Sequence, residues 1–434
     1  MAESDKSEAL QHVATAERKA ATLEELKSVE PAQINRAAVV GAGTMGGGIA
    51  MTFANAGIPV TVLETEADNL ERGLDTVKKN YQRSVDKERI SQAEMDERIT
   101  LITGTLDVSD LENADLVVEA VFEDMSVKKE VFARLGAITK PDAILATNTS
   151  TLDVNAIARR TSRPGQVVGM HFFSPAHIMK LLEVVRGDET SARTLATALT
   201  IGKRLGKVPV VVGVCDGFVG NRMLHKYARE AYFLLEEGAL PGQVDRVMRE
   251  FGMAMGPFAV GDLAGLDVGY RVRQAQAASR DPSERYSAIA DKVVELGRLG
   301  QKTGAGFYRY ESGSRTPTVD SIITELVEQH SAEVGIKRRE IADEEISKRL
   351  LYQLVNEGAK ILDEGIAQRA GDIDVVYVYG YGFPAERGGP MFFADTVGLG
   401  EVYQDVESFV SKYGEHWEPT SLLEHLAKTG AQFT

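Results

Sequence analysis

The stretch "AAVVGAGTMGGGIA", residues 37–50, decides the fold of the first part of the chain. Its apolar first four residues predict a short buried strand, and the glycines after them predict a tight turn that leads into a helix. The segment "PVTVLE" at 59–64 predicts a second strand. Strand, glycine turn, helix and strand together form a βαβ unit of the kind that binds dinucleotides.

The turn itself has GxGxxG spacing, and its members are Gly41, Gly43, Thr44, Met45 and Gly46. The first glycine permits the tight turn, the second lets the backbone approach a pyrophosphate, and the third lets the helix pack on the strand. The start of the helix offers unpaired N–H groups to phosphates. The alternative, a glycine cluster that marks only a turn, is disfavoured because strand, helix and a downstream acid are all in place.

That acid is Glu64, twenty-three residues after Gly41 at the end of the second predicted strand. A carboxylate at this point accepts hydrogen bonds from the ribose hydroxyls of the adenosine and repels a 2′-phosphate. The sequence therefore predicts NAD, rather than NADP, as the cofactor.

Apolar segments continue to alternate with helical patterns up to about residue 213. A charged helical stretch is expected at 68–99, and strands are expected at 116–121, 143–148, 166–173 and 208–213. This alternation predicts an α/β fold of Rossmann type, a doubly wound and mostly parallel sheet covered by helices on both faces.

From about Val214 the strand patterns stop and helical patterns repeat. The segment at 234–266 recurs at 361–399, which predicts two tandem all-α domains separated by the linker "SGSRTP" at 312–317. The expected organisation is an N-terminal helical arm (1–35), an NAD-binding Rossmann domain (36–213), a first helical domain (214–312) and a duplicated helical domain (313–434).

Composition narrows the classes of partner and compartment. The net charge of -15 over 434 residues disfavours nucleic acid or an anionic membrane as the main partner, and no apolar run has the length of a membrane span. A single cysteine, Cys215, suits a reducing compartment. The N-terminal stretch lacks a signal-peptide core, and the last three residues are not the small-basic-leucine address of peroxisomal proteins, so a cytoplasmic location is expected.

Polar residues stand where several of these segments end. In "GMHFFSPAHIMKLLEVV", residues 169–185, His171 lies at a strand end twelve positions before Glu183. The pair suits a general base and the carboxylate that holds its ring, or equally a core histidine and a surface glutamate. Ser150 follows another strand, and Asn221 in "DGFVGNRM" begins the first long helix. Parallel strands end at one sheet edge, so these side chains are expected to converge beside the nicotinamide.

Several motifs together resemble one enzyme family. GxGTMGxGIA, EAVFED, the NTS turn, HFFSP with LLEVV, GFVGNR and MGPFAxxDLAGLD are similar to the L-3-hydroxyacyl-CoA dehydrogenases of fatty-acid β-oxidation. The resemblance runs from about Arg36 nearly to the C-terminus. The tandem copy and "ATAERKA" near the start resemble the dehydrogenase portion of multifunctional enzymes of the peroxisomal bifunctional type, whose enoyl-CoA hydratase domain has no counterpart in this sequence.

The resemblance implies NAD-dependent, reversible oxidation of L-3-hydroxyacyl-CoA to 3-ketoacyl-CoA. It assigns His171 as the base that takes the hydroxyl proton and Glu183 as the carboxylate that orients the imidazole. Ser150 and Asn221 would bind the substrate oxygen. Many relatives have Asn after the aromatic pair, where this chain has Ser174.

Further contacts follow from the same resemblance. Glu123 and Lys128 are expected to contact the cofactor. Lys87 is a candidate for the CoA phosphates, although an ordinary surface lysine explains it equally well. Two histidines are expected to be structural, His177 and His225.

The second helical copy aligns Lys348-Arg349 with Asn221-Arg222, so it lacks the catalytic amide. It is therefore expected to be structural, and its likeness to the dimer interface of single-copy relatives favours a monomer. The expected partners are an acyl-CoA substrate and enoyl-CoA hydratase or thiolase enzymes, and no metal is expected.

Two other functions compete with the dehydrogenase. An acyl-CoA thioesterase could use Ser150, His171 and Glu183 as a triad, but Ser150 does not lie in a G-x-S-x-G elbow and a hydrolase needs no glycine fingerprint. The other is a non-catalytic NAD-binding remnant of a multifunctional enzyme, which the intact set of polar residues disfavours.

Overall fold

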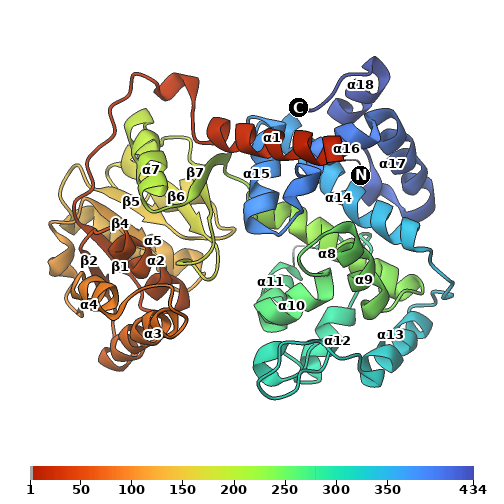
Figure 1. Ribbon diagram of the computed structural model, residues 1–434, viewed down its shortest axis with the longest axis horizontal. Helices are drawn as coiled ribbons and strands as arrows, with labels where there is room; N and C mark the ends of the chain where they lie inside the picture. Colours follow the sequence, from red (N-terminus) through yellow and green to blue (C-terminus); the bar gives the residue numbers. More distant parts are fainter. Residues whose placement is uncertain (1–2, 279) are drawn as a thin grey trace. The chain divides into compact units, whose positions relative to one another are not determined.

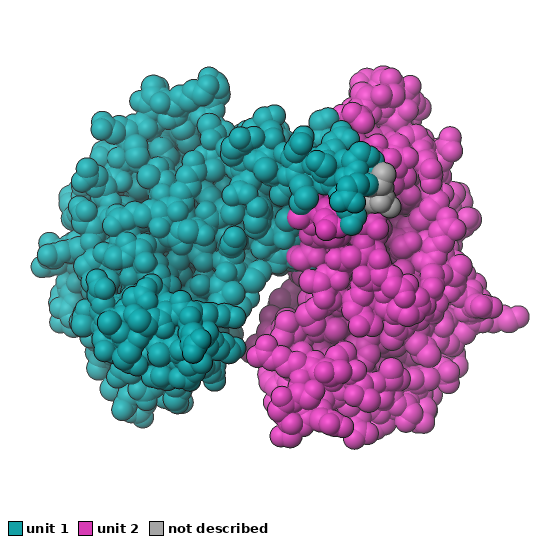
Figure 2. All heavy atoms as spheres, viewed as in Figure 1, with its two compact units in different colours: residues 1–222, 361–381, 433–434 teal, residues 223–360, 382–432 magenta. Residues whose placement is uncertain are grey.

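The computed structural model describes residues 3–278 and 280–434. The chain forms two compact units, which Figure 2 colours separately. Unit 1 comprises residues 1–222, 361–381 and 433–434, and unit 2 comprises residues 223–360 and 382–432. Residues 361–381 of the second helical copy thus belong to the first unit. The domain limits expected from the sequence stay a prediction.

Within the described residues, unit 1 contains one sheet with the strand order β3-β2-β1-β4-β5-β6-β7-β8 (Figure 1). All neighbouring strands in it are parallel except β6 and β7. The strands are β1 (Ala37–Val40), β2 (Val60–Leu63), β3 (Ile102–Thr105), β4 (Leu116–Glu119), β5 (Ile144–Thr147), β6 (Val167–Phe172), β7 (Leu181–Arg186) and β8 (Val208–Gly213). The predicted doubly wound, mostly parallel sheet is confirmed.

Helices cover both faces of this sheet, so every residue of β1, β4 and β5 is buried (Figure 1). They are α2 (Thr44–Asn55), α3 (Ala67–Asp86), α4 (Gln92–Thr100), α5 (Met125–Ile138), α6 (Val154–Ala158) and α7 (Ala192–Arg204). The charged helical stretch expected at 68–99 forms two helices, α3 and α4, because Ser91 and Glu94 form a capping box that starts the second one.

The strand β7 was not among the expected strands, and it fixes the geometry of the polar edge. It returns antiparallel to β6 after the turn at 173–180, and the register sets His171 opposite Glu183. Directly opposed residues in a sheet point to the same face, so the two side chains meet.

The N-terminal helix α1 (Glu3–Ala20) packs on α15 (Ala370–Gly380) within unit 1. His12 Nε2 lies 2.8 Å from a carboxylate oxygen of Asp374, which is buried. The segment before α15 meets the sheet edge, where the N–H of Gly213 donates to the carbonyl of Ile366 at 2.7 Å. Residues near the start and near position 370 therefore complete the first unit together.

Unit 2 is helical, and the helices α8 (Gly220–Glu237) and α14 (Asp343–Asp363) belong partly to each unit. Buried Asp245 and Asp262 organise the first copy. Asp262 accepts the backbone N–H groups of Phe307 and Tyr308 at 2.8 and 3.0 Å. The remaining helices are α9 (Pro241–Phe251), α10 (Pro257–Ala264), α11 (Leu266–Gln276), α12 (Ile289–Glu295), α13 (Ser321–Glu333), α16 (Pro390–Val397), α17 (Leu399–Tyr413) and α18 (Ser421–Thr429).

None of the helices in the described part of the chain combines the length and the apolar character that crossing a bilayer requires.

Candidate active site

The glycine turn between β1 and α2 is shaped for a ligand. Gly41 has φ +102°, and a Cβ at this position would lie 2.8 Å from the carbonyl oxygen of Ala120. A Cβ on Gly46 would collide with the carbonyl oxygen of Gly41, whereas one on Gly43 would meet nothing within 4 Å. Two glycines thus permit close packing, and the third leaves the backbone open to a neighbouring group.

The start of α2 lies at this open point. Gly43 is its N-cap and makes no side-chain capping bond. Thr44 is exposed as the first helical residue, while Met45 is half-buried against the core of the sheet. Unpaired N–H groups at a helix start attract phosphate oxygens, so the turn fits a pyrophosphate.

Glu64 follows β2 beside the same turn. Its carboxylate accepts the N–H of Ala42 at 3.0 Å and the N–H of Thr65 at 2.8 Å. These bonds hold the side chain at the strand end, where a ribose diol of an adenosine would lie relative to the glycine turn. The residues present therefore fit an NAD adenosine.

His171 and Glu183 form a buried pair at the far end of the same sheet edge. His171 Nδ1 lies 2.7 Å from Glu183 Oε2, with the histidine 6% exposed and the glutamate fully buried. The other oxygen, Oε1, accepts the N–H of Gly220 at 3.0 Å. The rings of Phe173 and Phe218 lie 4.4 and 5.8 Å from the imidazole. The pair is thus held by a backbone hydrogen bond and by aromatic packing. The alternative that Glu183 is a surface residue is wrong, because its side chain is fully buried.

Ser150 lies in the turn after β5, and Glu123 holds this turn. Glu123 Oε1 accepts the N–H of Ser150 at 2.7 Å, its hydroxyl at 3.1 Å and the hydroxyl of Thr149 at 2.7 Å. Burial alone would raise the pKa of Glu123, but the charge of Lys128 and these hydrogen bonds lower it. The lowered pKa favours the carboxylate form of Glu123, which holds the serine turn through these hydrogen bonds.

Lys128, 1% exposed, links Glu123 to a second buried carboxylate, Glu119. Its ammonium lies 2.6 Å from Glu119 Oε1 and 3.2 Å from Glu123 Oε2. The hydroxyl of Thr147 donates to the other oxygen of Glu119 at 2.7 Å. In the described chain Glu123 and Lys128 thus bind each other and the serine turn. Their expected contact with the cofactor stays a prediction.

Asn221 approaches the serine turn from the start of α8. Its Nδ2 donates to the carbonyl oxygen of Ser150 at 3.4 Å, and its Oδ1 accepts the hydroxyl of Tyr381 at 2.8 Å. Asn148 ties the ends of β5 and β6 together, since its Oδ1 accepts the N–H of Phe172 at 2.8 Å. Ser150, Asn221 and His171 are in this way connected through one network of strand ends.

The remaining expected residues lie elsewhere in unit 1. Lys87 is exposed at the C-terminal end of α3. Ser174 precedes Pro175 through a cis peptide bond in the turn between β6 and β7. The expected roles of Lys87 in binding CoA phosphates and of Ser174 near the ligand stay predictions.

Two residues of the network escaped the sequence analysis. Glu119 stands inside the apolar run "LVVEAV", and a carboxylate in a buried strand is itself a signal that a cation lies nearby. Tyr381 belongs to "GYGFP" of the second helical copy and reaches Asn221 across 160 positions of the chain. The second copy therefore contacts the network through Tyr381, and the expectation that this copy is structural stays a prediction.

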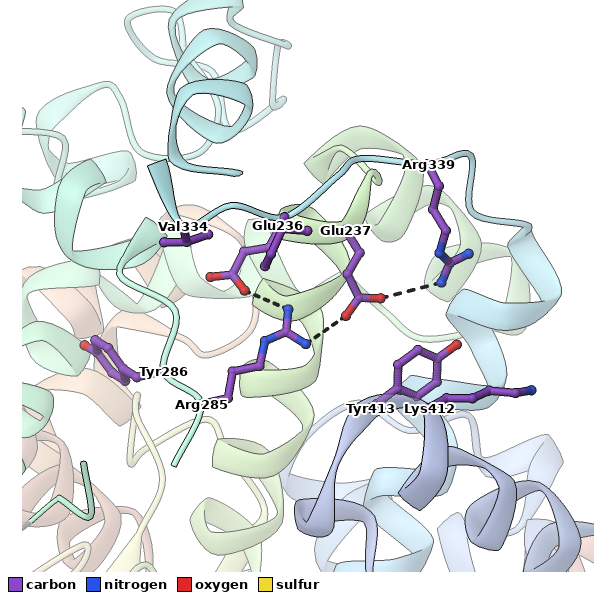
Figure 3. Close-up of a pocket in the computed structure, with 9 residues that line it drawn as sticks. Glu236, Glu237, Arg285, Tyr286, Val334, Arg339, Lys412 and Tyr413 are labelled. Atoms are coloured by element: carbon purple, nitrogen blue, oxygen red, sulfur yellow. Dashed lines mark hydrogen bonds and ion pairs between the residues drawn. The ribbon is translucent and has the colours of Figure 1, made fainter. Parts of the chain in front are cut away.

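Unit 2 has a cavity of about 660 Å³ of a different character (Figure 3). Arg285 donates to Glu236 at 2.8 Å and to Glu237 at 2.9 Å, and Arg339 lies 3.5 Å from Glu237. Both arginines of the cavity are thus already engaged by carboxylates. In the described part of the chain, no cluster of His, Cys, Asp and Glu has the arrangement of a metal site.

Comparison with known proteins agrees with this geometry. Residues 36–215 match the model of the 3-hydroxyacyl-CoA dehydrogenase NAD binding domain, and residues 217–310 and 346–432 match the C-terminal domain of the same family. The chain belongs to the 3-hydroxyacyl-CoA dehydrogenase family. The NAD predicted from the Gly41 turn and Glu64 is the cofactor of the matched domain, and the C-terminal match falls in two segments, as the internal repeat predicts.

Relatives of this dehydrogenase family include multifunctional proteins. The chain is 46% identical over 416 residues to the peroxisomal bifunctional enzyme of Danio rerio, covering 93% of this chain and 57% of that protein. The human peroxisomal bifunctional enzyme is 43% identical over 447 residues, covering 99% and 62%. The chain thus spans about three fifths of the length of these relatives. The cytoplasmic location expected from the sequence stays a prediction beside their peroxisomal names.

Two solved structures of the family share the fold over nearly the whole chain. The 3-hydroxybutyryl-CoA dehydrogenase of Escherichia coli has a TM-score of 0.80 at 27% identity, covering 92% of this chain and 99% of its own. The dehydrogenase part of multifunctional enzyme 1 from C. elegans has a TM-score of 0.70 at 31% identity, covering 95% and 96%. The Rossmann sheet followed by helical domains is thus confirmed as the fold class.

Proposed function

We propose that this chain catalyses the reversible oxidation of L-3-hydroxyacyl-CoA to 3-ketoacyl-CoA with NAD, as a step of fatty-acid β-oxidation. The observation that carries the proposal is the buried His171–Glu183 pair on the same sheet edge as the Gly41 turn. Family membership supplies the reaction class, and this pair supplies a base positioned to perform it.

His171 takes the proton of the 3-hydroxyl. The Glu183 carboxylate can only accept a hydrogen bond, so the proton of a neutral His171 imidazole lies on Nδ1 and is donated to Glu183. Nε2 is then left to act as the base. The carboxylate stabilises the imidazolium that forms, and the N–H of Gly220 keeps the carboxylate in place. NAD, when bound, supplies the acceptor for the hydride that C3 releases.

Ser150 and Asn221 position the substrate oxygen. The hydroxyl of Ser150 and the amide of Asn221 come from the ends of different elements, and both are tied to the same turn. The Asn221 amide keeps a second N–H for the substrate oxygen, and the Ser150 hydroxyl would exchange its bond to Glu123 for one to that oxygen. The two donors would then stabilise charge on the oxygen as the proton leaves.

The thioesterase alternative fits the geometry less well. A nucleophilic serine needs a hydrogen bond to its base, and Ser150 instead donates to Glu123 at 3.1 Å. We also propose that the chain is a monomer and that its partners include enoyl-CoA hydratase or thiolase enzymes.

The test is NADH oxidation by the purified protein in the presence of acetoacetyl-CoA, with His171→Ala as the variant. We expect rapid oxidation by the wild type and a loss of at least about 1000-fold in kcat for the variant, because the base and its imidazolium are removed together. His177→Ala, in the same turn region, is the matched control and should keep its rate. NADPH should react poorly because of Glu64.

NADH binding, followed by its fluorescence, separates the alternatives. A folded protein that binds NADH but leaves acetoacetyl-CoA unreduced would favour a binding module. Release of free CoA from an acyl-CoA without any change in NADH would favour the thioesterase.

A further inference from the structure

Asn221 can act on a substrate oxygen only if its amide faces the right way. A carboxamide presents an N–H₂ group at one end and a carbonyl oxygen at the other, and a rotation of 180° exchanges them with little change of shape. An Asn221 in the rotated state would place an acceptor where the reaction needs a donor. Something in the protein must therefore select one orientation.

Two groups contact the two ends of the amide. The carbonyl of Ser150 accepts only, and it lies 3.4 Å from Nδ2. The phenol of Tyr381 lies 2.8 Å from Oδ1. Burial, together with the charge of Glu183 and the neighbouring Tyr377, raises the pKa of Tyr381 well above its usual value. The phenol thus keeps its proton and donates it to Oδ1.

From these contacts we infer that Tyr381 is a positioning residue, which holds the Asn221 amide so that one N–H meets Ser150 and the other faces the substrate oxygen. The inference rests on the proposed function, in which Asn221 binds that oxygen. It gives the second helical copy a part in the chemistry, although this copy has no catalytic amide of its own.

The surroundings of Tyr381 hold its ring firmly. It stacks on Tyr377 with centroids 4.9 Å apart, and its edge meets Phe173 at 5.6 Å. Such aromatic contacts restrict both torsions of the side chain. Tyr381 is the C-cap residue directly after α15, so the end of the helix sets the reach of its hydroxyl.

Gly220 completes the fit between the two copies. A Cβ at this position would collide with the ring and the hydroxyl of Tyr381, so any larger residue would push the phenol away from Asn221. The same glycine donates its N–H to Glu183, and its carbonyl accepts the hydroxyl of Tyr377 at 3.4 Å. The first residue of α8 therefore joins the His171 pair, the amide and the second copy.

The first test is Tyr381→Phe, which removes the hydroxyl and keeps the ring. We expect kcat with acetoacetyl-CoA to fall about 10-fold, which corresponds to about 1.4 kcal/mol and is within the range for one hydrogen bond, while the Kd for NADH and the melting temperature stay unchanged. Tyr379→Phe is the matched control, since that hydroxyl, on the same helix, donates to Glu17. An undiminished kcat for Tyr381→Phe would overturn the inference.

A double-variant cycle separates positioning from general support of the structure. If Tyr381 acts through the amide, Tyr381→Phe should cost nothing further in an Asn221→Ala background. An additional 10-fold loss in that background would mean that the hydroxyl acts on something other than Asn221, and would overturn the inference.

The orientation can also be followed without turnover. The side-chain amide of Asn221, labelled with ¹⁵N and assigned by its disappearance in Asn221→Ala, should shift in Tyr381→Phe and stay in place in Tyr379→Phe. An unmoved signal would overturn the inference even in an inactive protein, whereas lack of activity in the wild type would overturn only the proposed function.

Discussion

The first turn of α8 and the second turn of α14 occupy matching positions in the two helical copies, but their side chains have different tasks. In α8, Asn221 contacts the serine turn and Arg222 donates to Glu364 at 2.8 Å. In α14, Lys348 lies 2.9 Å from Asp405, and Arg349 is fully buried. Equivalent positions thus contact the candidate active site in the first copy and form ion pairs within the helical unit in the second.

The arginines reveal how the copies are related. Glu364 in "ILDEG" matches Glu237 in "LLEEG", and Arg349 donates to Glu237 at 3.1 Å. Each arginine therefore pairs with the matching glutamate of the other copy. Arg222 and Glu364 are 16% and 50% exposed, whereas Arg349 and its second partner, Glu230, are both fully buried. Both copies thus contain the arginine–glutamate pair, but the buried pair is expected to contribute more to the free energy of unfolding than the exposed one.

The largest difference is expected in stability. Arg349→Met takes the arginine from the buried Glu230, which keeps His416 at 3.2 Å, and we expect a loss of about 3–5 kcal/mol in the free energy of unfolding. Arg222→Met, at the matching position, should lose about 1 kcal/mol or less because Glu364 is half exposed to water. Urea unfolding followed by Trp417, the single tryptophan, measures the first variant directly in unit 2. Far-UV circular dichroism should follow both, and equal losses would refute the comparison.

The next difference is expected in catalysis. Asn221→Ala should lower kcat with acetoacetyl-CoA about 100-fold, because a donor fixed beside the substrate oxygen is removed. Lys348→Ala, at the matching position, should leave kcat unchanged, since its ammonium pairs with Asp405 and Glu401. Steady-state kinetics of the two variants provide the measurement. A comparable fall in both would show that the second copy carries out chemistry of its own.

The smallest effect concerns acid stability. Burial alone would raise the pKa of Glu345, one turn before Arg349, but hydrogen bonds from Arg339 and Tyr413 lower it to about 2. A folded pKa below the unfolded value of 4.5 gives stability that is present above 4.5 and is lost as the pH falls towards 2. Glu345→Gln should thus lose about 1 kcal/mol near neutral pH, after allowance for screening at this partly exposed site.

Urea unfolding of Glu345→Gln and wild type at pH about 7 and about 3 tests this direction. The gap between the two proteins should narrow at the lower pH. A gap that widens on acidification would contradict the assignment of Glu345 as an ion-pair partner. The matching residue of the first copy is the buried Phe218, which cannot titrate.

Local patterns allowed much of the fold to be predicted from sequence. The Gly41 turn and Glu64 lie within one βαβ unit, where spacing along the chain fixes spacing in the structure. His171 and Glu183 were suggested together, but the antiparallel return of β7 that brings them face to face has no local signal distinct from any other apolar run.

Contacts between distant segments could not be predicted in this way. Asn221 and Tyr381 are in contact although 160 positions separate them in the chain, and neither residue type predicts the other as its partner. The Lys128 ammonium is held by Glu119, because a buried lysine is stabilised by a nearby buried carboxylate, and its expected contact with the cofactor stays a prediction. The catalytic roles themselves stay predictions until the variants are measured.

The pairing of Gly213 with Ile366 has a consequence for how the protein is made. β8 is the edge strand of the sheet, and the segment around Ile366 that bonds to its outer side is synthesised about 150 residues later. At about 5–20 residues per second this delay is about 10–30 s. During that interval the nascent first unit presents an uncovered strand edge, the kind of surface that chaperones bind and that drives aggregation when synthesis stalls.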